Sequence, residues 1–357
     1  MLQKIVTIAG TRPEWIRLSR IIYKLDQLLG DNHIVIDTGQ NYDKNLRDIF
    51  FAELGIRTPN YTMNARGSFG KQIGTIIEKS EDLFKLIKPD KVLILGDTNS
   101  GLSAYVAERL QIPVYHCEAG NRSYDKELPE EINRKLIDHS SSFNMPYTSR
   151  SRENLLREGI SPQSIFVSGN PILEVINHYF GEDTDILSKL NLTQRDYVVV
   201  TLHRSNNVDN PRRLTNILRG LAKIGDRGRN IIISTHPRTR EKVNHLIEKF
   251  NHNIKFLEPM GFLDFITLQK NAQCILTDSG TVQEEACILK VPCVVVRKST
   301  ERLETIECGA SVLSGVETDN IYSSYLYTHH MDTGWTVPEE YLYTNVSNRI
   351  INYLMGR

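Results

Sequence analysis

The stretch Lys91-Val-Leu-Ile-Leu95-Gly-Asp-Thr-Asn99 contains a continuous apolar run, Val92–Leu95, which is followed by a glycine and a carboxylate. Such a run is typical of a strand buried on both faces of a parallel sheet, because neither face needs polar residues. Similar runs recur along the chain, with amphipathic helical segments such as Phe69–Ile87 between them. This alternation predicts doubly wound α/β sheets. The other expected strands are residues 5–9, 33–37, 113–117, 164–168, 197–202, 230–234, 254–257, 274–277 and 291–297.

About ten strands exceed one comfortable sheet, and 357 residues fit two domains. A turn at Asn170-Pro171 and a polar connector after Gly181 mark the boundary. We expect an N-terminal Rossmann-like domain over residues 1–170 and a C-terminal one over residues 171–340. A last helix within residues 341–357 follows, and its return to the first domain is one possibility.

Composition excludes several function classes. Lys plus Arg and Asp plus Glu are both 43, so the net charge is zero and gives no support to nucleic-acid or membrane-surface binding. The cysteine count is odd (five) and no C-x-x-C occurs, which indicates free thiols in a reducing compartment and no metal site. The N-terminus has too short an apolar run for a signal peptide, and no stretch has transmembrane length. We expect a cytoplasmic protein.

In open α/β sheets the ligand lies beyond the carboxyl ends of the strands. The first expected strand is followed by Gly10-Thr-Arg-Pro-Glu-Trp-Ile-Arg17, a helix start that offers backbone N–H groups beside Arg12 and Arg17. This pattern favours phosphate binding over the alternative of a capped helix with surface arginines. No G-x-G-x-x-G occurs, which weighs against a bound dinucleotide cofactor.

Carboxylates follow the next strands. Asp97 and Glu118 each end a strand, and Glu130 lies in a helix start opened by Pro129. Taken alone, Asp97 could equally cap a helix, and Glu130 with Glu131 could simply complement the helix dipole.

The second half carries histidines and a further anion site at its strand ends. His203-Arg204 and His236 each follow a strand, and two histidines at one sheet edge favour a functional cleft. Ser279-Gly280 opens a helix that offers N–H groups to a phosphate, with Glu285 placed to accept from a ribose hydroxyl.

These motifs, in this order, resemble the UDP-N-acetylglucosamine 2-epimerase family over most of the chain. The resemblance implies a GT-B arrangement of two Rossmann-like domains, an active site in the interdomain cleft, and no nicotinamide, other cofactor or metal. It implies elimination of UDP to a 2-acetamidoglucal and re-addition after protonation of C2 from the opposite face. The catalytic residues implied are Asp97, Glu118, Glu130 and His203. The expected substrate-binding residues are Arg12, Arg17, Arg122, Arg204, His236, Ser279, Gly280, Thr281, Glu285 and Arg302.

Several positions depart from the family pattern: Arg17 replaces a lysine, Asn206 an acid, Thr281 a glycine and Leu303 a proline. The motifs Thr38-Gly-Gln-Asn-Tyr-Asp43, Glu118-Ala-Gly-Asn-Arg122 and Asp278-Ser-Gly-Thr281 resemble the branch that acts on UDP-linked N-acetyl L-sugars. We therefore expect a UDP-N-acetyl-L-sugar to be turned over better than UDP-N-acetylglucosamine, the other expected substrate together with its manno isomer. We also expect a role in capsule or O-antigen synthesis, and a homodimer. The alternatives are a hydrolysing epimerase, a GT-B glycosyltransferase and an inactive UDP-sugar binding protein.

Overall fold

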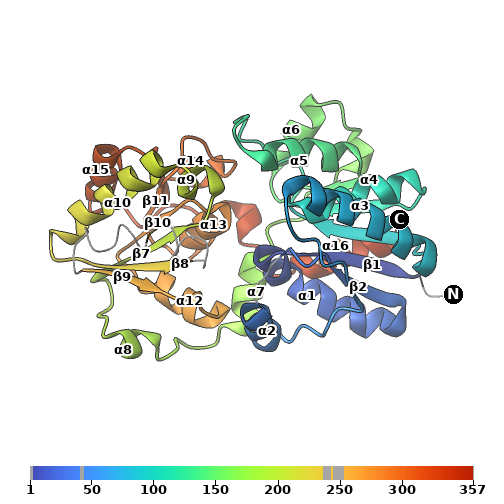
Figure 1. Cartoon of the computed structure of the whole chain (residues 1–357), viewed down its shortest axis with the longest axis horizontal. Helices are drawn as coiled ribbons and strands as arrows, with labels where there is room; N and C mark the ends of the chain where they lie inside the picture. The colour runs from blue at the N-terminus through green and yellow to red at the C-terminus, as the bar shows by residue number, and fades with distance from the viewer. Residues whose placement is uncertain (1–2, 41–43, 236–242, 244–252, 357) are drawn as a thin grey trace. The chain divides into compact units, whose positions relative to one another are not determined.

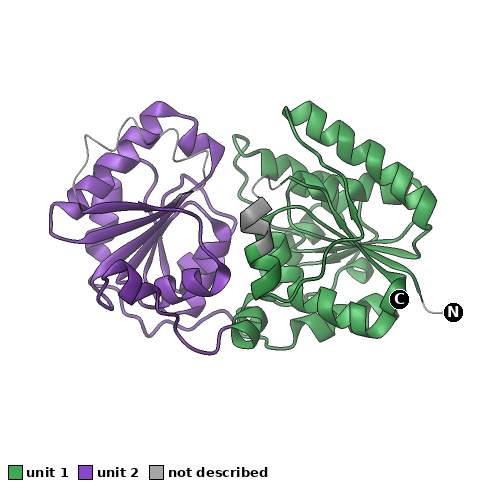
Figure 2. Cartoon of the chain, turned by 60° about the horizontal axis from the view of Figure 1, so that its bottom comes forward, with its two compact units in different colours: residues 1–179, 339–357 green, residues 180–338 purple. Residues whose placement is uncertain are grey.

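The computed structural model describes residues 3–40, 44–235, 243 and 253–356. The chain divides into two compact units, which Figure 2 colours separately. Unit 1 comprises residues 1–179 and 339–357, and unit 2 comprises residues 180–338. In the described part of the chain, each unit is built on one parallel sheet of six strands. The predicted fold class of two doubly wound, Rossmann-like α/β units of the GT-B type is confirmed.

Unit 1 has the strand order β3-β2-β1-β4-β5-β6. β1 lies between β2 and β4, so that Ile5 pairs with His33 on one side and Lys91 on the other. The strands are β1 Ile5–Ala9, β2 His33–Asp37, β3 Tyr61–Thr62, β4 Lys91–Leu95, β5 Val114–Cys117 and β6 Phe143–Met145. The helices, labelled in part in Figure 1, are α1 Arg12–Leu29, α2 Lys44–Glu53, α3 Phe69–Ile87, α4 Ser103–Arg109, α5 Pro129–His139, α6 Ser149–Arg157, α7 Ile172–Tyr179 and α16 Val346–Gly356, with 3₁₀ turns Gly30–Asn32, Asn99–Leu102, Pro162–Ser164 and Glu339–Tyr341.

Unit 2 repeats this topology with the order β12-β11-β10-β7-β8-β9. The strands are β7 Tyr197–Leu202, β8 Asn230–Thr235, β9 Ile254–Leu257, β10 Cys274–Thr277, β11 Cys293–Val295 and β12 Ser311–Leu313. The helices are α8 Ile186–Leu190, α9 Ser205–Val208, α10 Pro211–Gly225, α12 Phe262–Lys270, α13 Gly280–Ile288, α14 Leu303–Glu307 and α15 Thr318–Thr328.

The continuous apolar strands have the two-sided burial that the sequence predicts. In β7, Val198 and Val200 enter one hydrophobic core, while Tyr197 and Val199 enter a second core on the other face of the sheet. A β-branched run without alternation therefore suits a sheet covered by helices on both sides.

The division between the units falls after Tyr179, nine residues beyond the boundary at 170 expected from the sequence. The reason is that α7 packs on α1, where the Lys24 ammonium donates to the Glu174 carboxylate. Residues of α16 also belong to unit 1, since the Ser347 amide donates to Glu174 and the Lys91 ammonium to the Leu354 carbonyl.

The expected strand at residues 164–168 is wrong. Residues 162–164 form a 3₁₀ turn, and Ile165 makes only an isolated bridge to Asn144, next to the short strand β6. The short strands β3, β6 and β12 were not expected, because two or three residues are too few to show a pattern.

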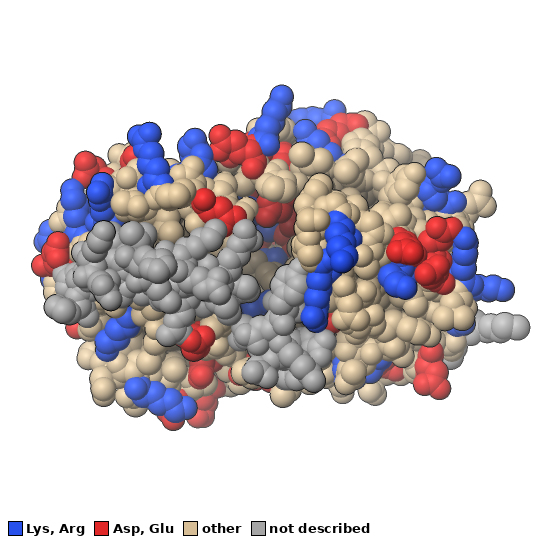
Figure 3. Space-filling view, in the orientation of Figure 1, with Lys and Arg blue, Asp and Glu red and all other residues tan. Residues whose placement is uncertain are grey.

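The surface matches the neutral composition. Figure 3 shows basic and acidic side chains interspersed over the visible face. Among the described residues, no helix is long and apolar enough to cross a membrane.

Candidate active site

Both sheets have a topological switch point, where the order of the strands reverses. In unit 1 it lies between β1 and β4, and in unit 2 between β7 and β10. The residues that follow these strands are Gly10–Arg12 and Gly96–Asp97 in unit 1, and His203–Arg204 and Asp278–Gly280 in unit 2. The open-sheet rule therefore selects the strand ends that the sequence singled out.

Glu118 follows β5 in a strained and buried position. Its φ is +67°, a left-handed conformation that a non-glycine residue adopts at a cost of about 1–3 kcal/mol. The Arg17 guanidinium lies 3.1 Å from the carboxylate, and the Tyr147 hydroxyl donates to it at 3.3 Å. The backbone is held because the Glu118 amide donates to the Met145 carbonyl at the end of β6. Strain that the surroundings maintain in this way is typical of functional positions.

The backbone two residues after Glu118 requires a glycine at position 120. Gly120 has φ +79°, and a β-carbon there would lie 2.2 Å from the Ser151 carbonyl oxygen. The Asn121 side chain lies on the same turn, with its amide nitrogen 3.4 Å from the Glu118 carboxylate and its oxygen accepting from the Ser151 hydroxyl. Asn121 therefore contacts the predicted catalytic carboxylate.

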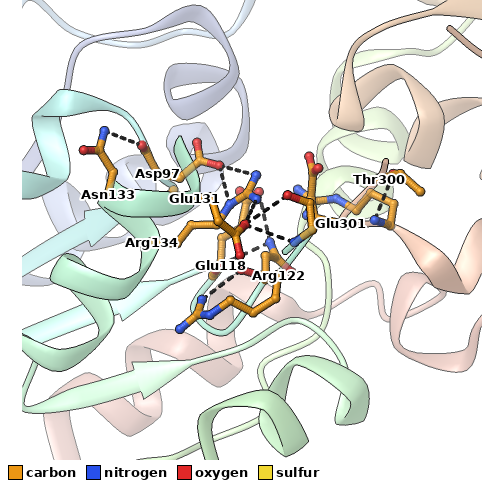
Figure 4. A network of polar contacts seen from close by, with 12 residues as sticks. Asp97, Glu118, Arg122, Glu131, Asn133, Arg134, Thr300 and Glu301 are labelled. Atoms are coloured by element: carbon orange, nitrogen blue, oxygen red, sulfur yellow. Dashed lines mark hydrogen bonds and ion pairs between the residues drawn. The ribbon is translucent and has the colours of Figure 1, made fainter. Parts of the chain in front are cut away.

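Asp97, beyond β4, is held by α5 (Figure 4). The Arg134 guanidinium donates to its carboxylate at 2.7–2.8 Å, and the Asn133 amide donates to its carbonyl at 3.0 Å. Arg134 also pairs with Glu131 at 2.9 Å. One arginine thus links a strand-end carboxylate to the helix start that carries Glu130.

Glu130 and Glu131 have different environments. Glu131 is buried, and it accepts from the amides of Ser123 and Tyr124 as well as from Arg134. Glu130 is half-buried in the first turn of the same helix. Because Glu131 anchors the preceding loop, it is poorly suited to replace Glu130 in proton transfer.

Glu14 is a buried carboxylate that the sequence reasoning missed as a functional candidate. It accepts from the backbone amides of Gly10 and Thr11 at 2.6 and 3.0 Å, and from the Thr98 hydroxyl. Burial raises its pKa to about 7, against the lowering effect of these hydrogen bonds, and the nearby Asp97 adds to the rise. A β-carbon on Gly96 would lie 4.0 Å from both the Glu14 and the Glu118 carboxylates, so both flank this glycine.

The three arginines of unit 1 that are predicted to bind substrate have different partners. Arg12 stacks over the Phe50 ring at 4.2 Å, and Arg17 pairs with Glu118. The Arg122 guanidinium is buried, and it pairs with Asp138 at 2.8 Å and with Glu158 at 2.6–2.8 Å. Although burial opposes it, these carboxylates raise the pKa of Arg122. Arg122 thus braces the loop after Glu118, and a direct substrate contact for it stays a prediction.

In unit 2, His203 and Asp278 form a dyad between the ends of β7 and β10. His203 Nδ1 lies 3.0 Å from the buried Asp278 carboxylate. The second ring nitrogen, Nε2, does not take part in this contact, and the histidine side chain is half-exposed. The carboxylate also accepts from the backbone amides of His203 and Arg204 and from the Asn207 side chain. Burial acts to raise the pKa of Asp278, but His203 and Arg204 outweigh it and the pKa is lowered. A carboxylate on Nδ1 fixes the orientation of an imidazole.

The N-terminus of α13 lies directly after this aspartate. Ser279 is the N-cap, and its side chain accepts from the Val282 amide. The first amides of the helix, at Gly280 and Thr281, have no intrahelical acceptor and suit an anion. A β-carbon on Gly280 would lie 2.6 Å from Glu301 Oε1, so a glycine is needed for this close approach.

Glu301 lies among buried arginines in unit 2. The Arg297 guanidinium is 2.7 Å from its carboxylate, and that of Arg204 is 3.4 Å away. Figure 4 labels Glu301 and the neighbouring Thr300. Arg302 is buried and ion-paired with Glu284. This ion pair gives Arg302 a structural role, and its role in substrate binding stays a prediction.

Glu285, the expected ribose contact, is buried within α13. Gln269 of α12 donates to its carboxylate at 2.7 Å. His236 lies outside the described residues, as do residues 41–43 of the motif that begins at Thr38.

The partners missed from the sequence are Glu14, Arg134 and Asp278. The sequence does carry a signal for Asp278 and Glu14 as functional candidates. Asp278 follows a strand and Glu14 lies at a helix start, and each is next to residues already singled out. Arg134 had none, because its pairing with Asp97 spans 37 residues.

A family model described as UDP-N-acetylglucosamine 2-epimerase matches residues 26–355. The UDP-N-acetylglucosamine 2-epimerase of Methanocaldococcus jannaschii is 43% identical over 347 residues, with 94% of each chain covered. The UDP-2,3-diacetamido-2,3-dideoxy-D-glucuronate 2-epimerase of Pseudomonas aeruginosa is 35% identical, with 98% of this chain and 99% of that protein covered.

Among solved structures, the M. jannaschii enzyme in complex with UDP-GlcNAc and UDP superposes with a TM-score of 0.93 at 41% identity, covering 99% of both chains. The family resemblance predicted from the motifs is thereby confirmed. The chain belongs to the UDP-N-acetylglucosamine 2-epimerase family, a family of isomerases.

Proposed function

We propose that this chain epimerises C2 of a UDP-N-acetylhexosamine by eliminating and re-adding UDP. The observation that carries the proposal is the strained, buried Glu118, paired with Arg17 next to the switch point of unit 1. A carboxylate in such a position is suited to carry a proton.

The proposed reaction has two halves. A base removes the proton from C2 while the C1–O bond to UDP breaks with its electrons, which leaves a 2-acetamidoglucal. A proton then returns to C2 on the opposite face, and UDP re-adds at C1. Inversion requires a proton carrier on each face, and we assign these roles to Glu118 and Glu130, with Asp97 held beside them by Arg134.

Unit 2 is proposed to hold UDP and assist its departure. The first amides of α13 would receive phosphate oxygens, and Glu285 would accept from the ribose. His203, oriented by Asp278, would donate to the diphosphate as the C1–O bond breaks. Arg12, Arg17 and Arg204 are proposed to add positive charge around the leaving group.

We propose UDP-N-acetylglucosamine and UDP-N-acetylmannosamine as the substrate pair, on the strength of the M. jannaschii relative. A UDP-N-acetyl-L-sugar is the second candidate, favoured by Asn121, whose amide contacts the Glu118 carboxylate. An amide both donates and accepts, so it changes which ring hydroxyls the site can pair. Comparing kcat/KM for UDP-N-acetylglucosamine with that for UDP-N-acetyl-L-fucosamine and its L-rhamno relative decides between them. Either product class would feed the synthesis of surface polysaccharide.

Proton NMR in heavy water tests the reaction. The expected product is an intact UDP-sugar that carries deuterium at C2. Free N-acetylmannosamine with UDP would instead indicate the hydrolysing reaction. Turnover that requires a sugar acceptor would indicate a glycosyltransferase, and an epimer without deuterium would exclude proton exchange at C2.

We also propose a homodimer formed through unit 1. Tyr105 of α4 and Ile132 and Leu136 of α5 are large apolar side chains, each at least half exposed, on two helices that pack together. A second copy would bury this surface. Sedimentation of the wild type as a dimer, and of Ile132→Glu as a monomer, is the expected result, whereas a monomeric wild type at micromolar concentration would contradict it.

A further inference from the structure

Two cysteines of unit 2 lie in contact although they are 21 residues apart. The Sγ atoms of Cys287 and Cys308 are 3.7 Å apart, and no disulfide joins them. Cys287 is buried in the last turn of α13, and Cys308 is half-buried directly after α14. Neither thiol has a part in the proposed chemistry.

The backbones around the two thiols are fixed by other contacts. Gln283 of α13 donates to the Arg302 carbonyl and to the Thr305 hydroxyl, and the Thr300 hydroxyl donates back to Gln283. The Trp335 indole donates to the Cys287 carbonyl at 3.1 Å. Because α13 and the segment around α14 are already joined, the thiols are held close together, and closing to an S–S bond of about 2.05 Å requires only a local movement.

The hydrogen bond between the two thiols and their unequal burial give them different roles. The Cys287 thiol, hydrogen-bonded to Cys308, lowers the pKa of Cys308, and Lys290 lowers it further. The same contact, together with burial, raises the pKa of Cys287. The thiolate form, which is the nucleophile, is thus favoured on the more exposed of the two sulfurs.

We infer that Cys287 and Cys308 are an oxidisable dithiol that closes into a disulfide between α13 and α14. The oxidant is a low-molecular-weight disulfide such as oxidised glutathione. The Cys308 thiolate attacks one of its sulfurs, which forms a mixed disulfide and releases one glutathione thiolate. Cys287 then loses its proton and attacks Cys308 Sγ, which releases the second glutathione. Two protein thiols are oxidised and one glutathione disulfide is reduced.

This inference stands apart from the proposed epimerase function, because it concerns the thiols alone. The disulfide would nevertheless lie in the same region as the proposed UDP site, since α13 begins at Gly280 and the segment before α14 carries Glu301. The disulfide would tie the far end of α13 to the residue that directly follows α14.

The test is peptide mapping of the folded, full-length protein after incubation with oxidised glutathione and alkylation of the remaining thiols. We expect a cross-linked peptide pair containing Cys287 and Cys308, which dithiothreitol reverses, while Cys117, Cys274 and Cys293 are alkylated on unfolding. Cys287→Ser should retain glutathione on Cys308, whereas Cys308→Ser should carry neither a disulfide nor an adduct on Cys287.

Cys293→Ser is the matched control, since Cys293 is a buried thiol of the same unit whose pKa is raised by burial. This variant should form the Cys287–Cys308 bond as the wild type does. Alkylation of both Cys287 and Cys308 in the oxidised wild type would overturn the inference. So would accumulation of the adduct on Cys287 in Cys308→Ser, because that would reverse the assigned roles.

Discussion

The two units share one topology and differ in what their strand ends carry. Unit 1 places carboxylates there, and the Glu118 side chain is 7% exposed and paired with an arginine. Unit 2 places a histidine there, and the His203 side chain is 51% exposed over a buried aspartate. Identical strand orders thus carry an arginine-paired carboxylate in one unit and a histidine–aspartate pair in the other. The side chains at the strand ends, not the sheets, therefore distinguish the two units.

Two buried carboxylates sharpen the comparison. Glu14 in unit 1 has a raised pKa, whereas Asp278 in unit 2 has a lowered one. Burial acts to raise the pKa of both. Asp278 has His203 and Arg204 beside it, while Glu14 has another acid, Asp97, nearby. The neighbouring charges therefore decide the sign of the shift.

The largest expected effect is on catalysis in unit 1. Glu118→Gln should lower kcat by roughly 100- to 10,000-fold, because an amide cannot carry the proton. UDP affinity, which we assign to unit 2, should stay close to that of the wild type. Turnover assays and calorimetry with UDP measure the two effects separately. Glu78→Gln on the exposed face of α3 is the control, and near-normal turnover of Glu118→Gln would exclude it as a proton carrier.

A smaller effect is expected on the pH dependence of stability. The folded-state pKa of Glu14, about 7, lies above its ordinary value of 4.5, so the folded state binds the extra proton and stability falls as pH rises between these values. In Glu14→Gln the amide can keep the contacts to Gly10, Thr11 and Thr98 without this titration. From pH 5 to pH 8, the variant should gain up to about 3 kcal/mol in free energy of unfolding relative to the wild type.

For Asp278, the pH dependence of stability should have the opposite sign to that for Glu14. Its lowered pKa contributes stability that is present above the ordinary value of 3.8 and is lost as pH falls through the folded-state pKa. Asp278→Asn should therefore be destabilised at neutral pH. Denaturant titrations across the pH range measure both variants, and a pH-independent difference between Glu14→Gln and wild type would contradict the assignment.

The next smaller effect is expected on the affinity of unit 2 for UDP. Gly280→Ala places a methyl group against Glu301, whose carboxylate Arg297 and Arg204 hold in place. The displacement should disturb the first amides of α13 and weaken UDP binding by roughly 10- to 100-fold. Calorimetry measures the change.

Gly74→Ala in α3 is the matched control. Gly74 is exposed in a helix, and a β-carbon there meets no atom within 4 Å among the described residues. This variant should keep UDP affinity and gain about 0.4–1 kcal/mol of stability. If Gly280→Ala binds UDP as tightly as Gly74→Ala does, α13 does not hold the phosphates.

The sequence predicted the central strands and the strand-end residues, but not how those residues pair. β1, β2, β4, β7 and β10 follow the expected ranges, because every residue in them is buried and their sequences are mostly apolar. The partly exposed β9 also follows its expected range. The pairs Arg17–Glu118 and His203–Asp278 join residues 101 and 75 positions apart, so only the fold brings them together. The left-handed conformation of Glu118 is equally hidden, since glutamate carries no signal for a positive φ.

The smallest expected effect separates helix capping from ligand binding within unit 2. Ser279 caps α13 through the Val282 amide, and Asn210 caps α10 through the amides of Arg212 and Arg213. Replacing either cap by alanine should cost about 1 kcal/mol of stability, since a first-turn amide loses its acceptor. Only Ser279→Ala should also weaken UDP binding, by a few-fold, because the proposed phosphate amides belong to α13. Thermal unfolding and UDP calorimetry on both variants test this. Equal UDP affinities would show that Ser279 stabilises the helix without contributing to the anion site.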